Sequence, residues 1–198
     1  MEALRRGEEW DDKPRDWTPY YRWLEPRLQS GRWAVIPDMP GAPSQLNDSL
    51  LAEWPFGTSY GVPLWHMDGP LDRLGRLCSK YDTVALGWIG DPKREPVGCD
   101  RYRRRMDEVS ALFGNRWPDT HMMRGIKVAF DYDFVSADAT SLAQNGHRYD
   151  SPIDTLCGDQ WRGRRAYADK LERRRPELHK PDRRDRTPVR EAQRLDLE

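Results

Sequence analysis

The sequence has few cysteines, no long hydrophobic run and no glycine motif of the dinucleotide-binding kind. Each of these features argues against a class of site or of protein. Cys78, Cys99 and Cys157 lie far apart, without the paired spacing that frames a zinc site or a small disulfide scaffold. We therefore expect reduced thiols. No apolar run approaches the ~18 residues of a membrane span, and the N-terminus lacks the apolar stretch of a secretory signal. The sequence thus predicts a cytoplasmic protein without membrane contact.

The whole chain has no excess of positive or negative charge, since it contains 33 basic and 33 acidic residues. This balance argues neither for nor against a nucleic-acid partner. Hydrophobic residues make up 37% of the sequence and the mean hydropathy is −0.96, so the core must be concentrated in a few short runs. Nine tryptophans help to build that core, because each buries a large area.

The two ends of the chain differ in composition. Residues 161–198 hold 13 basic and 8 acidic side chains, a net charge of +5 that leaves −5 for residues 1–160. We expect residues 1–160 to form one α/β domain and residues 161–198 to form a basic tail, helical in part near Tyr167 and otherwise disordered. A solvated tail without a partner is the favoured interpretation, and weak contact with phosphates is the alternative.

Short apolar runs alternate with segments of helical spacing. Runs of strand length bounded by turn residues occupy residues 33–37, 62–67, 83–87, 120–123 and 134–137. Apolar side chains at helical spacing predict helices at residues 16–29, 71–78 and 101–113. Strands that are apolar on both faces and alternate with helices indicate a parallel sheet, either a TIM-type (β/α) barrel or a doubly wound open sheet.

We favour the barrel, because no Gly-x-Gly-x-x-Gly follows any of the expected strands. Five strands are fewer than the eight of a complete barrel. Either some strands are too short to recognise in the sequence, or the barrel is incomplete, and we favour the incomplete barrel.

Polar residues that end the apolar runs are the candidates for chemistry, since reacting groups of barrel enzymes lie at the carboxyl ends of strands. Asp38 and Asp138 both follow such runs. Two carboxylates facing one cleft suit chemistry at the anomeric carbon of a sugar, where one attacks C1′ and the other moves protons. Aspartate at a strand end is also a common turn or N-cap residue, so the pattern alone leaves both interpretations open.

Four segments resemble, in the same order, strands of the base-exchanging transglycosylases. Residues 136–148, Ser-Ala-Asp-Ala-Thr-Ser-Leu-Ala-Gln-Asn-Gly-His-Arg, are similar to the segment in which a nucleophilic Asp precedes an Asn-Gly turn. Residues 121–125 resemble the Tyr-Leu-Met-Gly strand whose Met lies against the base, and residues 33–38 resemble the strand whose Asp acts as acid and base. Residues 83–90 are similar to the strand and glycine turn between them.

The resemblance is greatest to the DpdA-type (deoxypurine in DNA) guanine transglycosylases of phages and defence systems. Their Leu-Trp-His-Met-like strand followed by Pro-Leu-Asp-Arg-Leu is matched by residues 64–67 and 70–74. The resemblance covers residues 17–150 and implies a pentosyltransferase that replaces guanine in DNA with a 7-deazaguanine. The implied partners are DNA, a free 7-deazaguanine base and a helper ATPase.

The resemblance also implies roles for individual residues. Asp138 is the expected nucleophile and Asp38 the expected acid/base residue. The expected substrate-binding residues are Met123, Gly87, Trp88 and His66. The expected nucleic-acid-binding residues are Asn145, His147 and Arg148. No cofactor is expected, and no metal, because the Cys-x-Cys-x-x-Cys of the tRNA enzymes is missing beside Cys157.

Other interpretations of the same residues remain open. The family's first strand, with its Asn-Gly-Ala-Phe-like turn, has no match before Arg5, so we expect the barrel to lack it, and the alternative function is a non-catalytic DNA- or partner-binding remnant. A glycoside hydrolase that uses Asp38 and Asp138 is a third possibility. Without the resemblance, Met123 is core filler, His66 a hydrogen-bonded barrel histidine, and His147 part of a solvated turn.

Overall fold

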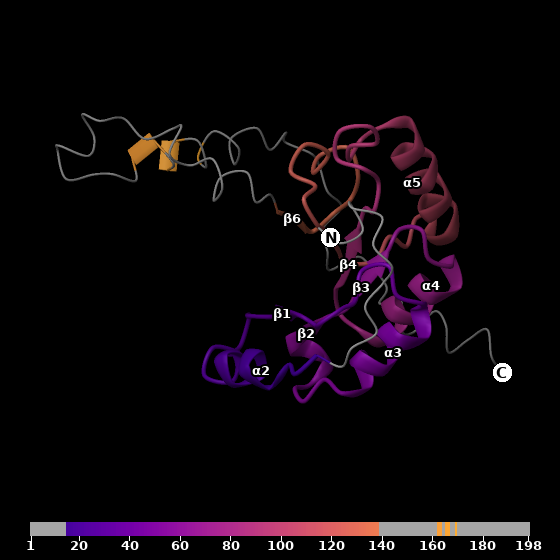
Figure 1. Cartoon of the computed structure of the whole chain (residues 1–198). Coiled ribbons are helices and arrows are strands. Elements are labelled where there is room, and N and C mark those ends of the chain that lie inside the picture. The colour runs from indigo at the N-terminus through magenta and orange to yellow at the C-terminus, as the bar shows by residue number, and fades with distance from the viewer. Residues whose placement is uncertain (1–14, 139–161, 164, 167–168, 170–198) are drawn as a thin grey trace.

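The structure is a computed structural model that describes residues 15–138, 162–163, 165–166 and 169 (Figure 1). Its named elements, in chain order, are α2 (Thr18–Leu24), β1 (Ala34–Val35), α3 (Ser44–Ala52), the 3₁₀ helix η1 (Thr58–Tyr60), β2 (Gly61–Val62), β3 (Leu64–His66), α4 (Leu71–Lys80), β4 (Val84–Gly87), α5 (Asp100–Phe113), β5 (Thr120–Met122) and β6 (Ser136–Ala137). The predicted α/β class is confirmed, and each expected strand is found at its predicted place. Most of the predicted tail lies outside the described residues.

All the strand pairs of the described region are parallel, and each pair joins two strands that are consecutive in the chain. β1 pairs with β2, and a second ladder runs in the order β3-β4-β5-β6. The two ladders meet at Pro63, which lies between β2 and β3 and has no N–H to donate. The Pro63 carbonyl still accepts from the Ala85 N–H at 2.9 Å. A doubly wound sheet reverses its strand order at a switch point, and the strands of the described region contain no such reversal.

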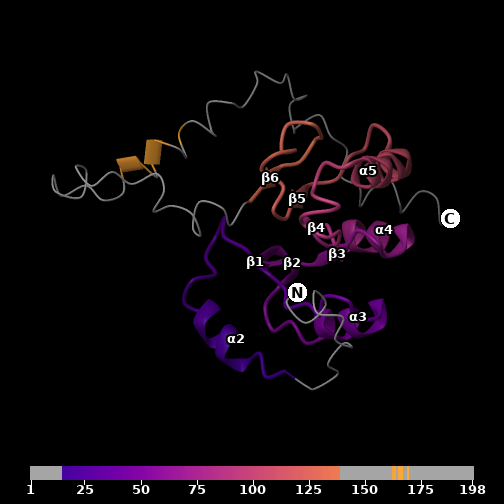
Figure 2. The same ribbon diagram turned by 45° about the horizontal axis from the view of Figure 1, so that its top comes forward.

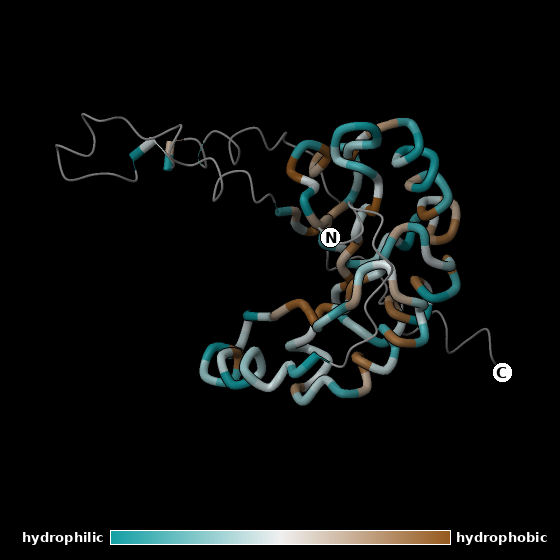
Figure 3. Tube along the Cα trace, viewed as in Figure 1, coloured by the Kyte–Doolittle hydropathy of each residue, from teal (hydrophilic) through white to brown (hydrophobic). Residues whose placement is uncertain are grey.

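Helices α3, α4 and α5 lie on the same side of the strands in both views (Figures 1 and 2). The side chains that the strands turn toward these helices are buried: Trp65 of β3, Leu86 of β4 and Met122 of β5 are each 0% exposed. The Tyr102 hydroxyl of α5 donates to the sulfur of Met122 at 3.4 Å. The hydrophobic segments gather along the strands, whereas α5 is mostly hydrophilic (Figure 3). The core therefore lies between one face of the strands and the helices.

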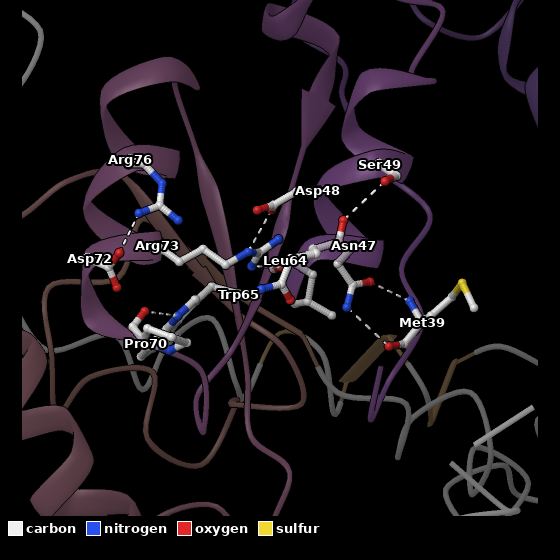
Figure 4. Close-up of polar contacts among 11 residues, drawn as sticks. Met39, Asn47, Asp48, Ser49, Leu64, Trp65, Pro70, Asp72, Arg73 and Arg76 are labelled. Atoms are coloured by element: carbon white, nitrogen blue, oxygen red, sulfur yellow. Dashed lines mark hydrogen bonds and ion pairs between the residues drawn. The ribbon is translucent and has the colours of Figure 1, made fainter. Parts of the chain in front are cut away.

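A buried arginine ties α3 and α4 to the sheet (Figure 4). The Arg73 side chain of α4 donates through Nε to Asp48 of α3 at 2.8 Å and through Nη1 to the Leu64 carbonyl of β3 at 3.2 Å. Only 5% of the Arg73 side chain is exposed. Because a buried guanidinium needs partners, this pair fixes how the two helices lie against β3.

Two local features differ from the sequence prediction. The helix predicted over residues 16–29 ends at Leu24, because Pro26 cannot continue the hydrogen-bond ladder. Helix α3 was not predicted, since its sequence holds Ser44, Asn47 and Asp48, which are weak helix formers. Its buried Asn47 amide instead bonds to the backbone N–H of Met39 at 2.8 Å, which anchors the loop after β1.

Two of the predicted chain properties can be compared with the described region. Cys78 and Cys99 are free thiols there, as expected. No helix among the described residues has the length and apolar character that crossing a bilayer requires.

Candidate active site

Four of the predicted site residues stand in one row across the carboxyl edge of the sheet. His66 is in register with Gly87. Past the ends of the next strands, the Met123 N–H donates to Leu86 and the Asp138 N–H donates to Met122, so Met123 and Asp138 continue the row. Residues in register on parallel strands point to the same face of a sheet. The buried Trp65 and Met122, one residue earlier, point to the helices, so this row points to the opposite face.

Asp38 joins the row through His66. It follows β1 after Ile36 and Pro37, and its Oδ2 lies 2.8 Å from the Nε2 atom of His66. The two side chains keep small exposed fractions, 23% for Asp38 and 13% for His66. An imidazole and a carboxylate at this distance form a hydrogen bond, and both are side chains of the types that serve as general acids and bases.

Asp138 forms a second carboxylate–histidine contact. Its Oδ1 lies 3.5 Å from the Nε2 atom of His121, and the Nδ1 atom of His121 lies 2.8 Å from the Ser136 hydroxyl. Since an ionised carboxylate only accepts, Nε2 of His121 is the donor, and Nδ1 of a neutral ring then accepts from Ser136. This chain of contacts fixes the orientation of the His121 ring, which the edge of the Trp33 ring also meets at a centroid distance of 5.3 Å.

A strained turn supplies a further donor to Asp138. The Gly125 N–H donates to the Met122 carbonyl, which closes a four-residue turn after β5. Arg124, the third residue of that turn, has φ of 56°, in the left-handed region that favours glycine. Its N–H donates to Asp138 Oδ1 at 2.5 Å. Such strain is often found at functional sites, where it holds a group in place.

These contacts keep Asp138 ionised. The His121 imidazole is the largest cause that lowers the pKa of Asp138 below its ordinary value, and the Arg124 N–H adds to it, while partial burial opposes both. The side chain of Asp138 remains 39% exposed. A carboxylate that is both ionised and accessible can act as a nucleophile toward an electrophilic carbon.

The remaining predicted residues lie in two different places. Gly87 is buried, and a Cβ there would come within 3.2 Å of Leu64 and 3.5 Å of the His66 ring, so the backbone at Gly87 packs closely beside His66. Trp88 points away from this row: its indole N–H donates to the Glu95 carbonyl at 2.7 Å, and its ring meets the edge of Tyr102 of α5. The base-binding role of Trp88 stays a prediction, with its ring on the α5 side.

Sequence reasoning did not single out His121, Ser136 or the Arg124 N–H as functional groups. Their signal is the register, since His121 pairs with Ser136 and precedes Met123 by two residues, which places all three side chains on one face. The register could not be read from the sequence. Asn145, His147 and Arg148, the predicted nucleic-acid contacts, lie outside the described residues.

The described region holds no group of three or more His, Cys, Asp or Glu side chains placed to bind a metal ion. The titratable groups that the structure brings together at the carboxyl edge of the sheet are two carboxylate–histidine pairs, Asp38–His66 and Asp138–His121. Comparison of the chain with protein-family models, with curated proteins and with solved structures gave no match.

Proposed function

We propose that this chain is a DNA base-exchange transglycosylase that replaces guanine with a 7-deazaguanine through a covalent enzyme–DNA intermediate. The observation that carries the proposal is Asp138, an ionised and accessible carboxylate that the His121 ring and the Arg124 N–H hold at the carboxyl end of a parallel strand. The ordered resemblance of the strands to the DpdA-type transglycosylases supports the same assignment.

In the proposed reaction, an Asp138 oxygen attacks C1′ of a deoxyguanosine that has left the base stack, and the C1′–N9 bond breaks. Guanine leaves with the bonding electrons and takes a proton from the Asp38–His66 pair. The incoming 7-deazaguanine then gives its N9 proton to that pair and attacks C1′. The ester bond to Asp138 breaks, and two inversions at C1′ give net retention.

The place of Asp38 suits the proton-transfer role. Its carboxylate shares a hydrogen bond with His66, so the two groups form one unit that can pass a proton to a departing base and take one from an incoming base. Gly87 and Met123 lie between this pair and Asp138 in the row. A planar base bound over Gly87 and Met123 would have the proton-transfer pair on one side and the nucleophile on the other.

The spacing of the two pairs is compatible with a nucleoside substrate. His66 and Asp138 stand three strands apart in the row, which is about 14 Å between backbones in a flat sheet with strands ~4.8 Å apart. A nucleoside offers its sugar and its base as two separate points of attack.

We infer an incomplete TIM-type barrel as the architecture that carries this site. The strands follow one another in sequence order, all are parallel, and the helices α3, α4 and α5 share one side of them. In a barrel, the opposite face of the strands is the interior, and the carboxyl ends of the strands form the mouth where reacting groups lie.

The proposal is tested by trapping the covalent intermediate. Wild-type protein is mixed with a guanine-containing oligonucleotide, denatured and run on a gel that separates free DNA from protein-linked DNA. Wild type should give a linked band that a 7-deazaguanine base discharges, and Asp138→Asn should give none. The exposed Asp107→Asn on α5 is the control and should behave as wild type. Wild-type protein that binds the oligonucleotide and never forms the linked band would indicate the non-catalytic remnant instead.

A further inference from the structure

A groove between α2 and β1 has the composition of a nucleic-acid site. It encloses about 550 Å³. The side chains with aromatic rings or positive charge that line it are Tyr20, Trp23, Arg27, Arg32 and Trp33. No acidic residue is part of the lining.

Two tryptophans of the groove are more exposed than tryptophans usually are. Trp23 is 53% exposed and Trp33 is 41% exposed, and both belong to the small set of large hydrophobic residues that the described region leaves exposed. The Tyr20 and Trp23 rings are stacked, 14° from parallel. Large apolar rings left in water at one place mark a binding surface, and rings of this kind are platforms for stacking.

Positive charge accompanies the rings. The Arg27 guanidinium lies 4.5 Å from the centre of the Trp23 ring, and its Nη1 donates to the Trp23 carbonyl at 2.6 Å. Arg32 lies at the other end of the lining, next to Trp33. Within the part of the chain that the structure describes, no carboxylate forms an ion pair with Arg27 or Arg32. Aromatic rings and unpaired arginines together are the features with which proteins hold single-stranded nucleic acids.

The groove leads to the candidate nucleophile. The Trp33 ring that lines it meets the His121 ring edge-on at 5.3 Å between centroids, 69° from parallel. His121 in turn contacts Asp138. A strand of nucleotides in the groove would therefore pass within one side chain of the residue proposed to attack C1′.

We propose that this groove binds the unpaired DNA beside the nucleotide that reacts, with bases stacked on Trp23 and Trp33 and phosphates held by Arg27 and Arg32. The inference rests on the proposed function for the identity of the strand as DNA. It adds to that function a requirement for several unpaired nucleotides, because a base that stacks on Trp33 cannot also be paired in a duplex.

The direct test measures, by fluorescence anisotropy, the binding of a fluorescein-labelled oligodeoxythymidylate of about 12 nucleotides. Trp23→Ala and Trp33→Ala should each weaken binding by about fivefold or more, since one stacked base contributes on the order of 1–3 kcal/mol. Arg32→Ala should weaken binding and lower the slope of log K against log salt by about 0.7, as expected for one phosphate contact on a single strand. A mixed-sequence duplex of equal length should bind less tightly than the single strand.

Matched controls come from the opposite side of the molecule. Leu112→Ala removes an exposed hydrophobic side chain from α5, and Arg104→Ala removes an exposed arginine from the same helix. Both should leave the affinity within about twofold of wild type. Circular dichroism melts of every variant establish that a loss of binding is not a loss of folding.

The two experiments distinguish failure of the groove proposal from failure of the proposed function. Asp138→Asn should bind the oligonucleotide as wild type does. Wild-type protein that shows tryptophan-dependent binding but never forms the covalent band rejects the proposed function and keeps the groove. Folded Trp23→Ala, Trp33→Ala and Arg32→Ala variants that bind as tightly as wild type would overturn the groove. So would displacement of the DNA from the groove by an excess of an acidic peptide but not by unlabelled DNA.

Discussion

The Nε2 atom of His121 lies 3.5 Å from Oδ1 of Asp138, across the gap between the neighbouring strands β5 and β6. The proposed nucleophile is thus oriented by a residue of the adjacent strand and not by its own. His121 is itself held by the Ser136 hydroxyl and the Trp33 ring. In the proposed reaction it would act through Asp138, as a positioning residue.

Replacement of His121 by Phe should change the acid dependence of the protein. Asp138 has a lowered pKa in the folded state, so its contribution to stability is present above its ordinary pKa of 3.8 and is lost as the pH falls through the folded value. The difference in free energy of unfolding between wild type and Asp138→Asn should therefore be larger at pH 6 than at pH 2. The difference should stay under about 1 kcal/mol, because the partly exposed pair is screened by water.

In the His121→Phe background the same difference should shrink, since the largest cause of the lowered pKa is gone. Urea unfolding at several pH values gives the free energy of unfolding of all four proteins: wild type, Asp138→Asn, His121→Phe and the double variant. His66→Phe is the control, because His66 contacts Asp38 and leaves the Asp138 contacts in place. An unchanged pH dependence in His121→Phe would show that the contact does not control the Asp138 carboxyl.

Arg124 gives a test of the strained turn. At φ of 56° a side chain costs roughly 1–2 kcal/mol, while glycine at the same place loses about 0.5–1 kcal/mol of chain entropy. Arg124→Gly should therefore be as stable as wild type or up to about 1 kcal/mol more stable, and it keeps the N–H that bonds to Asp138. Arg124→Val should be less stable, because a branched side chain fits this region poorly. Chemical denaturation decides, and a destabilised glycine variant would mean that the arginine side chain holds the turn.

The positions of the strands, and of the two aspartates at their carboxyl ends, could be predicted from the sequence for a physical reason. Strands buried on both faces are short apolar runs, and in parallel sheets the residue after such a run stands at the carboxyl edge. Asp38 and Asp138 are found there. Helix α3 escaped prediction because its polar residues, Asn47 among them, make contacts with other segments that no local pattern contains.

The partners of the aspartates could not be predicted, because they depend on register. His121 meets Asp138 only because His121 pairs with Ser136, and a shift of one residue would turn its ring to the helices. Trp88 shows the same limit. Its ring follows Gly87 by one residue and therefore points to α5, where the Tyr102 ring meets it.

Two glycines distinguish packing at the site from packing elsewhere. Gly75, inside α4, has no atom within 4 Å of an added Cβ, so Gly75→Ala should raise stability by about 0.5–1 kcal/mol. Gly87→Ala should leave the fold intact, because Leu64 can shift a flexible methyl group by a few tenths of an ångström. Gly87→Val should reduce formation of the covalent band by more than its lowered melting temperature explains, since its larger side chain takes up space beside His66. Equal losses in Gly87→Val and in a variant of matched stability far from the row would argue that Gly87 serves folding only.

The buried Arg73 predicts which ion pair of α4 carries stability. Asp48→Asn removes the charge that compensates a guanidinium with a nearly buried side chain, so it should cost roughly 2 kcal/mol or more. Asp72→Asn is the matched control, because Asp72 and Arg76 form an i, i+4 pair on the same helix with both side chains well exposed. Its cost should be under about 1 kcal/mol, from a screened pair and a weakened interaction with the helix dipole. Urea denaturation compares the two variants. A cost for Asp48→Asn no greater than for Asp72→Asn would mean that the Asp48 charge does not stabilise the buried Arg73 side chain.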